Sequence, residues 1–173
     1  SIKGAVLIEG AKWCGKTTSA KHIAKSAIEM DRPDMTEQYQ QRARMKPSNL
    51  LEGKVPHLID EWQIATNIWN AVRYEVDRRG EFGQFILTGS SVPAKLDESM
   101  HTGTGRIVRM RMRPMSLFES RDSGGQVSLC DLFNGKEISA VDDHGIEDIA
   151  FMICRGGWPA ALNHSENVVL RQA

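Results

Sequence analysis

The apolar positions of this sequence follow two different periods, and the elements that they predict alternate along the chain. Residues 5–9 (AVLIE), 57–60 (HLID) and 84–88 (QFILT) are short apolar runs, which are typical of strands buried on both faces of a sheet. Between and after these runs, apolar side chains recur at helical spacing or the composition favours a helix. The predicted helices are residues 16–26, 34–45, 66–80 and 146–155, with Thr66 as the N-cap of the third and Gly80 at its end.

Two further segments predict strands of other kinds. Residues 27–30 form a short strand, and residues 106–113 alternate strictly between apolar and basic side chains. Val108, Met110 and Met112 share one face of that segment, and Arg109, Arg111 and Arg113 share the other. We expect the apolar face to be buried and the arginine face to be solvated. Strands alternating with helices predict an α/β fold, a mainly parallel sheet in a three-layer α/β/α arrangement.

Composition restricts the kind of protein without naming a function. The 173 residues are enough for one domain with a stable core. The 22 basic and 22 acidic residues balance, so nucleic acid is not indicated as a partner. No run of 18 apolar residues predicts a membrane span, and the first residues do not resemble a secretory signal. Three cysteines without a CxxC pair fit a reducing, cytoplasmic setting.

The end of the sequence suggests a second region. A boundary is expected near Pro114 or nearer residues 156–159, and we take the second position. Residues 1–155 then form one domain, and residues 156–173 begin a further region as a short helical extension. The final segment, ENVVLRQA, has no helix terminator. We therefore expect a longer protein with a C-terminal effector domain.

Residues 10–17 (GAKWCGKT) match the phosphate-binding pattern G-x-x-x-x-G-K-[ST] between a predicted strand and a predicted helix. The glycines let backbone amides turn towards a β-phosphate, and the helix N-terminus adds a partial positive charge. Lys16 would bridge the β- and γ-phosphates, and Thr17 would bind Mg²⁺. A chance match is expected in about one chain in a hundred of this length. The predicted nucleotide-binding residues are Gly10, Ala11, Lys12, Trp13, Cys14, Gly15, Lys16, Thr17 and Thr18.

An apolar strand that ends in two acids, HLIDEW, supplies the second half of such a site. Asp60 would hold Mg²⁺ beside Thr17, and Glu61 would polarise the attacking water. The plain alternative is a strand that ends in two solvated carboxylates. The position of this pair, 43 residues after Thr17 in an alternating chain, favours the functional interpretation.

Two more side chains are candidates for contact with the γ-phosphate. Thr88, and with less support Ser90, lie in FILTGSS where a neighbouring strand would end, although the same residues make an ordinary turn. Arg106 follows the flexible TGTG segment, and we expect it to reach a phosphate in its own site or in that of a neighbouring copy.

Taken together, these motifs resemble the AAA-plus ATPase domain of bacterial and archaeal ATP-binding proteins that carry an uncharacterised C-terminal domain. The resemblance rests on GAKWCGKT, LIDEWQ, FILTGS, GTGRI, RPMSLFES and GGWPAAL. It implies a P-loop sheet in which other strands separate the loop-bearing strand from the next strand in sequence. It also implies that Lys16, Thr17, Asp60 and Glu61 are the Walker residues, whereas the sensor arginine of a lid has no counterpart to assign.

The expected function is therefore that of a switch module that binds ATP with Mg²⁺ and hydrolyses the ATP. A P-loop phosphotransferase and a non-hydrolysing ATP-binding scaffold are the alternatives, and self-association into a homo-oligomer stays open. Glu61 beside Asp60 favours hydrolysis, because small-molecule kinases with this loop often lack a water-activating acid there. An N/T-K-x-D element that would read guanine is absent from the sequence, so ATP is the expected nucleotide.

Overall fold

The computed structural model describes residues 3–89 and 103–163. Contacts divide the chain into two units, Ser1–Arg113 and Pro114–Ala173, and each unit is described by itself. The division falls at the first of the two boundaries that the sequence suggests. The predicted domain limits, 1–155 and 156–173, imply that residues 114–155 function with the first unit. That assignment stays a prediction.

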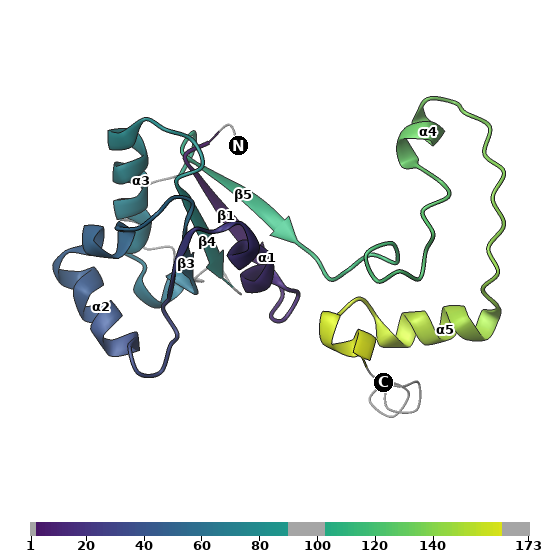
Figure 1. Ribbon diagram of the computed structural model, residues 1–173, viewed down its shortest axis with the longest axis horizontal. Helices are drawn as coiled ribbons and strands as arrows, with labels where there is room; N and C mark the ends of the chain where they lie inside the picture. Colours follow the sequence, from purple (N-terminus) through teal and green to yellow (C-terminus); the bar gives the residue numbers. More distant parts are fainter. Residues whose placement is uncertain (1–2, 90–102, 164–173) are drawn as a thin grey trace. The chain divides into compact units, whose positions relative to one another are not determined.

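The first unit is built on a five-stranded sheet in which every neighbouring pair is parallel (Figure 1). The spatial order is β2-β3-β4-β1-β5, so two strands separate β1 from β2. This order confirms the predicted parallel sheet and the expected separation of the loop-bearing strand from the next strand. The strands are β1 (Ala5–Gly10), β2 (Ser26–Glu29), β3 (His57–Asp60), β4 (Phe85–Gly89) and β5 (Ile107–Met112).

Helices cover both faces of this sheet, as the three-layer prediction requires (Figure 1). On one face lies α1 (Lys16–Ile23), and on the other lie α2 (Thr36–Met45) and α3 (Ile68–Arg79). Two short 3₁₀ helices, η1 (Pro47–Leu51) and η2 (Trp62–Ala65), lie on the same face as α2 and α3. Gly80 ends α3 in the left-handed conformation that favours glycine, as expected.

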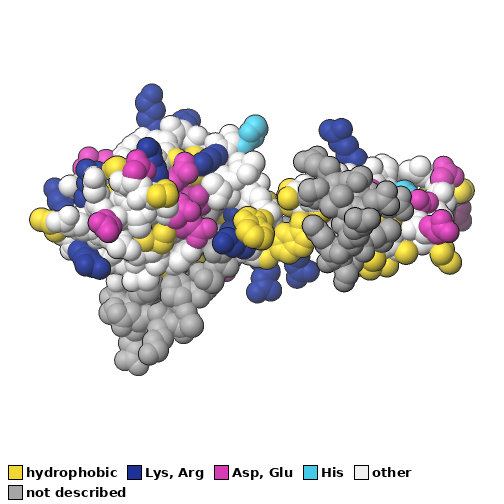
Figure 2. Space-filling view, turned by 90° about the horizontal axis from the view of Figure 1, so that it is seen from below, with side chains coloured by type: hydrophobic (Ala, Val, Ile, Leu, Met, Phe, Trp, Pro, Cys, Tyr) yellow, Lys and Arg dark blue, Asp and Glu magenta, His cyan; other side chains and the backbone are white. Residues whose placement is uncertain are grey.

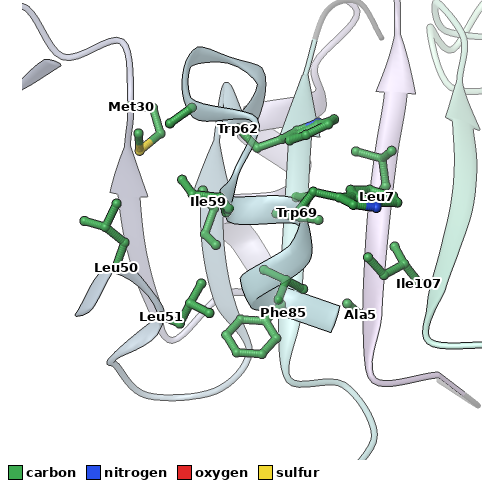
Figure 3. Packing of buried hydrophobic residues seen from close by; sticks show 14 of the residues in the cluster. Ala5, Leu7, Met30, Leu50, Leu51, Ile59, Trp62, Trp69, Phe85 and Ile107 are labelled. Atoms are coloured by element: carbon green, nitrogen blue, oxygen red, sulfur yellow. The ribbon is translucent and has the colours of Figure 1, made fainter. Parts of the chain in front are cut away.

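The larger part of the core lies between the sheet and the layer of α2 and α3 (Figure 3). The rings of Trp62 and Trp69 pack there with their centroids 5.2 Å apart, and Leu7 belongs to the same cluster. Under α1 a smaller cluster joins Ala20 to the alternate side chains of the central strands. Because β3 and β4 are buried on both faces, they read in the sequence as continuous apolar runs.

The register of the sheet brings the candidate site residues to one edge. Asp60 pairs with Thr88 across β3 and β4, Ile8 pairs with Thr88 across β1 and β4, and Gly10 pairs with Met112 across β1 and β5. The carboxyl ends of four parallel strands therefore meet beside the loop that follows β1. In open α/β sheets, ligands bind at this edge.

Three local predictions need correction. Asn67, and not Thr66, is the N-cap of α3, because the Asn67 carbonyl oxygen accepts the first i→i+4 bond, from the Ala71 amide, whereas that of Thr66 accepts an i→i+3 bond from the Trp69 amide. The apolar face of β5 is not buried along its length. Val108 and Met110 are 42% and 50% exposed, because the cluster beneath α1 includes Met112 but neither of these two residues. The helix predicted over residues 16–26 ends at Ile23, because Ala24 already has an extended backbone. Ser116 and Glu119 form the reciprocal bonds of a capping box at the start of a turn.

The second unit contains α4 (Leu129–Phe133), the amphipathic α5 (Ile146–Arg155) and the 3₁₀ helix η3 (Pro159–Asn163). An ion pair between Arg155 and Asp122 ties α5 to the preceding turns. Among the described residues, no helix has the length and apolar character that crossing a membrane requires. On the first unit, basic and acidic side chains lie interspersed over the face that Figure 2 shows.

Candidate nucleotide site

The loop between β1 and α1 is shaped by glycine at both of its ends. Gly15 has φ of 102°, a left-handed backbone that other residues rarely adopt, and it is the N-cap of α1. Gly10 is needed for a different reason, since an added Cβ would lie 2.2 Å from the backbone carbonyl oxygen of Met112. The loop therefore rests directly against the end of β5.

The Lys16 side chain folds back over this loop. Its ammonium group donates hydrogen bonds to the carbonyl oxygens of Gly10 (2.9 Å) and Ala11 (2.8 Å), and the residue is only 5% exposed. A buried cation requires such partners. The arrangement holds a positive charge inside the loop, beside the N-terminus of α1, where an anion is favoured.

Asp60 is the point at which the loop, β3 and β4 converge. Its Oδ1 accepts a hydrogen bond from the Thr17 hydroxyl at 2.9 Å and a second from the Thr88 hydroxyl. Asp60 is 4% exposed and Thr88 is 1% exposed. The structure thus brings together three predicted site residues that lie far apart in the sequence.

Glu61 follows Asp60 in a strained backbone conformation. Its φ of 53° and ψ of 45° are left-handed, which is uncommon for a residue with a side chain. Its carboxylate accepts a hydrogen bond from the amide of Gln63. Trp13 in the loop has a comparable φ of 65°. Two of the non-glycine residues with positive φ therefore lie at this site, and such strain concentrates at functional positions.

The donor set here suits a hard cation. The Thr17 hydroxyl donates its hydrogen bond to Asp60, so the lone pairs of its oxygen stay available to bind a cation. The Asp60 carboxylate is itself an oxygen ligand. Oxygen ligands of this kind, completed by phosphate and water, are those that Mg²⁺ prefers. No group of three or more His, Cys, Asp or Glu side chains that could hold a metal occurs in residues 3–89 and 103–163.

The other predicted loop residues have different surroundings. Cys14 is 2% exposed and its thiol points to the Met112 carbonyl oxygen at 3.9 Å, so it packs against β5. Trp13 is 78% exposed, with the Lys12 ammonium 5.2 Å from its ring centroid. The remaining predicted positions, Ala11 and Thr18, are exposed along the loop and the first turn of α1.

Arg106 does not lie at the loop of its own chain. It precedes β5, and the neighbouring Ile107 pairs with Ala5 at the end of the sheet opposite Gly10, roughly 17 Å away along the strand. Its guanidinium donates to both carboxylate oxygens of Asp77 at 2.8 and 2.9 Å, which raises the pKa of Arg106 and lowers that of Asp77. The expected contact with a phosphate of its own site is therefore wrong, and the contact with a neighbouring copy stays a prediction.

Three residues of the site were not predicted. Gln63 bonds to Glu61, and Met112 supports the loop. Gly89 is the third, because an added Cβ there would lie 2.5 Å from the side-chain amide oxygen (Oε1) of Gln63. The sequence could have indicated Gln63, because it lies two residues after Glu61. The contacts of Met112 and Gly89 depend on how the strands pair, which the sequence does not show. Ser90, the second sensor candidate, lies outside the described residues.

Comparisons with known proteins identify a family for the chain. Residues 3–120 match the family model described as an AAA domain, which is more than half of the chain. Solved structures that match include that of C. elegans PCH-2, with 18% sequence identity and a TM-score of 0.43. That match covers 68% of this chain and 37% of the other, so this chain spans well under half of its length. No curated protein sequence gives a significant match.

Proposed function

The chain belongs to the AAA domain family of P-loop NTPases, and on that premise we propose that it binds ATP with Mg²⁺ and hydrolyses the ATP. The family membership supports nucleotide binding in general. The proposal adds the metal, the reaction and the residues that carry it.

One observation carries the proposal: Asp60 Oδ1 accepts hydrogen bonds from the hydroxyls of both Thr17 and Thr88. A carboxylate, a loop hydroxyl and a hydroxyl of the adjacent strand are brought together, and the same loop holds the buried ammonium group of Lys16. A chance match to the loop pattern would not require the partner acid to lie in this position.

Each of these groups then has a defined role in binding. The Lys16 ammonium exchanges its bonds to the Gly10 and Ala11 carbonyl oxygens for bonds to phosphate oxygens, which are charged and therefore stronger acceptors. Backbone amides of the loop and of the first turn of α1 donate to the phosphates. Thr17 and Asp60 hold Mg²⁺, which when bound neutralises charge on the phosphate oxygens.

Hydrolysis requires a base, and Glu61 is the side chain next to Asp60 that can act as one. A water molecule attacks the γ-phosphorus and passes a proton to the Glu61 carboxylate, while the bond from the γ-phosphorus to the bridging oxygen breaks. The products are ADP and inorganic phosphate. The Thr88 hydroxyl, at the end of β4, orients Asp60 on the γ-phosphate side.

The test is phosphate release by the purified protein with ATP and Mg²⁺, compared with Glu61→Gln. We expect the variant to lose about a hundredfold or more in kcat, and to retain ATP binding because the loop is unchanged. Glu52→Gln makes the same chemical change at an exposed position and should behave as the wild type.

The other outcomes separate the alternative functions. ADP formed only when an acceptor molecule is added would show a phosphotransferase. Tight ATP binding without turnover in the wild type would show a non-hydrolysing scaffold. Equal turnover in the wild type and in Glu61→Gln would contradict the role of Glu61.

Several wider expectations accompany this proposal. They are a cytoplasmic location, self-association into a homo-oligomer, and a C-terminal effector domain that the ATPase controls. In a homo-oligomer, Arg106 is the side chain proposed to reach the site of a neighbouring copy.

A further inference from the structure

Gln63 contacts the proposed catalytic base directly. It lies in η2, two residues after Glu61, and its Nε2 donates a hydrogen bond to Glu61 Oε2. Glu61 enters η2 through its left-handed backbone, which turns the chain sharply enough to bring these two side chains together.

The Gln63 amide has its orientation set by this bond. Its Oε1 is buried and has no hydrogen-bond partner among the residues that the structure describes. Reversing the amide would turn Oε1 towards the Glu61 carboxylate and place two acceptors face to face. The bond to Glu61 is therefore the contact that fixes the amide, and the amide in turn restricts the carboxylate.

Gly89 closes over the other side of the same amide. An added Cβ at Gly89 would lie 2.5 Å from Gln63 Oε1 and 3.2 Å from Trp62 Nε1. Gly89 does not have a left-handed backbone, so the close approach is what requires a glycine there. It follows Thr88, whose hydroxyl bonds to Asp60. The end of β4 thus contacts both acids of the site, one directly and one through Gln63.

We propose that Gln63 is a positioning residue that holds the Glu61 carboxylate in place for water activation. Position 89 is then occupied by glycine because a larger side chain there would displace the Gln63 amide. The inference rests on the proposed ATPase function. An amide suits this task because it donates a hydrogen bond without placing a full positive charge beside the base. A lysine or arginine there would stabilise the ionised carboxylate and weaken it as a proton acceptor.

The first test is Gln63→Glu, which preserves the size of the side chain and removes its donor. Because a small misplacement of a catalytic group is costly, we expect kcat for phosphate release to fall about tenfold to a hundredfold. The dissociation constant for ATP should stay within about threefold, since the loop contacts are unchanged. Gln41→Glu makes the same change at an exposed position of α2 and should leave kcat unaltered.

The second test is a double-mutant cycle between Gln63 and Gly89. Gly89→Ala should lower kcat by displacing the flexible end of Gln63, so Gln63→Ala combined with Gly89→Ala should be no slower than Gln63→Ala alone. A purely structural defect at Gly89 would add to the loss instead. Gln63→Ala also removes the donor without adding charge, so it tests the same contact if Gln63→Glu does not fold.

The outcomes distinguish this inference from the function on which it rests. If the wild type releases phosphate and Glu61→Gln abolishes release, but Gln63→Glu and Gln63→Ala retain wild-type kcat, the positioning role is wrong and the ATPase function stands. Fully additive losses in the cycle would overturn the role of Gly89. A wild type without turnover would overturn both the function and the inference.

Discussion

At the scale of single residues, Asp60 accepts two hydrogen bonds from hydroxyl groups through one carboxylate oxygen, and this arrangement organises the candidate site. The hydrogen bond to Asp60 orients the Thr17 hydroxyl, whose oxygen is a proposed ligand of Mg²⁺. The bond from Thr88, which is 1% exposed, holds the carboxylate from the neighbouring strand. Loss of either hydroxyl would leave the buried acid with one fewer donor, and that is costly in an interior.

Replacing Thr88 tests this arrangement. Thr88→Val preserves shape and removes the hydroxyl, so we expect the free energy of unfolding to fall by about 1–3 kcal/mol. We also expect kcat for phosphate release to fall about tenfold or more, because Asp60 is no longer held. Thr88→Ser retains the hydroxyl and should retain most of the activity. Wild-type kcat in Thr88→Val, measured alongside urea unfolding, would contradict the role assigned to Thr88.

The sequence predicts those residues whose chemistry depends on local spacing. Lys16 and Thr17 follow from the loop pattern, and Asp60 follows from an apolar run that ends in acid. Contacts between strands have no such signal. The place of Gly89 against the Gln63 amide, and the place of Arg106 at the far end of the sheet, depend on register and on the direction of β5.

At the scale of elements, the loop at residues 10–17 depends on β5, the edge strand that pairs with β1. The carbonyl oxygen of Met112 lies under Gly10 and faces the Cys14 thiol. The Met112 side chain packs against the cluster beneath α1, and its methyl carbon lies 3.6 Å from the position of an added Cβ at Gly15. The end of β5 therefore forms the floor of the loop.

Gly10→Ala tests this support. The added Cβ would lie 2.2 Å from a backbone oxygen that cannot rotate away, so the strand end must shift. We expect a loss of about 1–3 kcal/mol in the free energy of unfolding, together with weaker ATP binding. Urea unfolding and calorimetry measure the two effects. Gly124→Ala, where the nearest atoms are 3.9 and 4.0 Å away, should change stability by less than about 0.5 kcal/mol. Equal stability of both variants would contradict this role of β5.

The limits of most elements are predicted from the sequence, because apolar runs and helical stripes are local patterns. The five strands and the helices α2, α3 and α5 appear within two residues of their expected limits, whereas α1 ends three residues early, at Ile23. The alternation in β5 predicts a strand correctly but not the burial of its apolar face, because Val108 and Met110 depend on which helix packs there. That packing is a property of the tertiary structure, and an alternation of apolar and polar residues does not predict it.

At the scale of the whole molecule, every residue of the candidate site lies in the first unit, Ser1–Arg113. The family match runs from residue 3 to residue 120 and so extends slightly beyond that unit. The first unit thus contains the sheet, its helices and the proposed ATPase residues. The second unit, which begins directly after the β5 end that supports the loop, is separate from them in sequence.

If the loop at residues 10–17 and Asp60 bind ATP with Mg²⁺, as proposed, calorimetric titration with ATP will detect that binding itself. We expect one-to-one binding by the wild type that weakens when Mg²⁺ is removed. Lys16→Ala should weaken binding by about a hundredfold or more, because bonds to charged groups contribute about 1.5–3 kcal/mol each. It should remain folded by circular dichroism, and Lys54→Ala at an exposed position should bind normally. Unchanged ATP affinity in a folded Lys16→Ala variant would contradict the proposed ATP site.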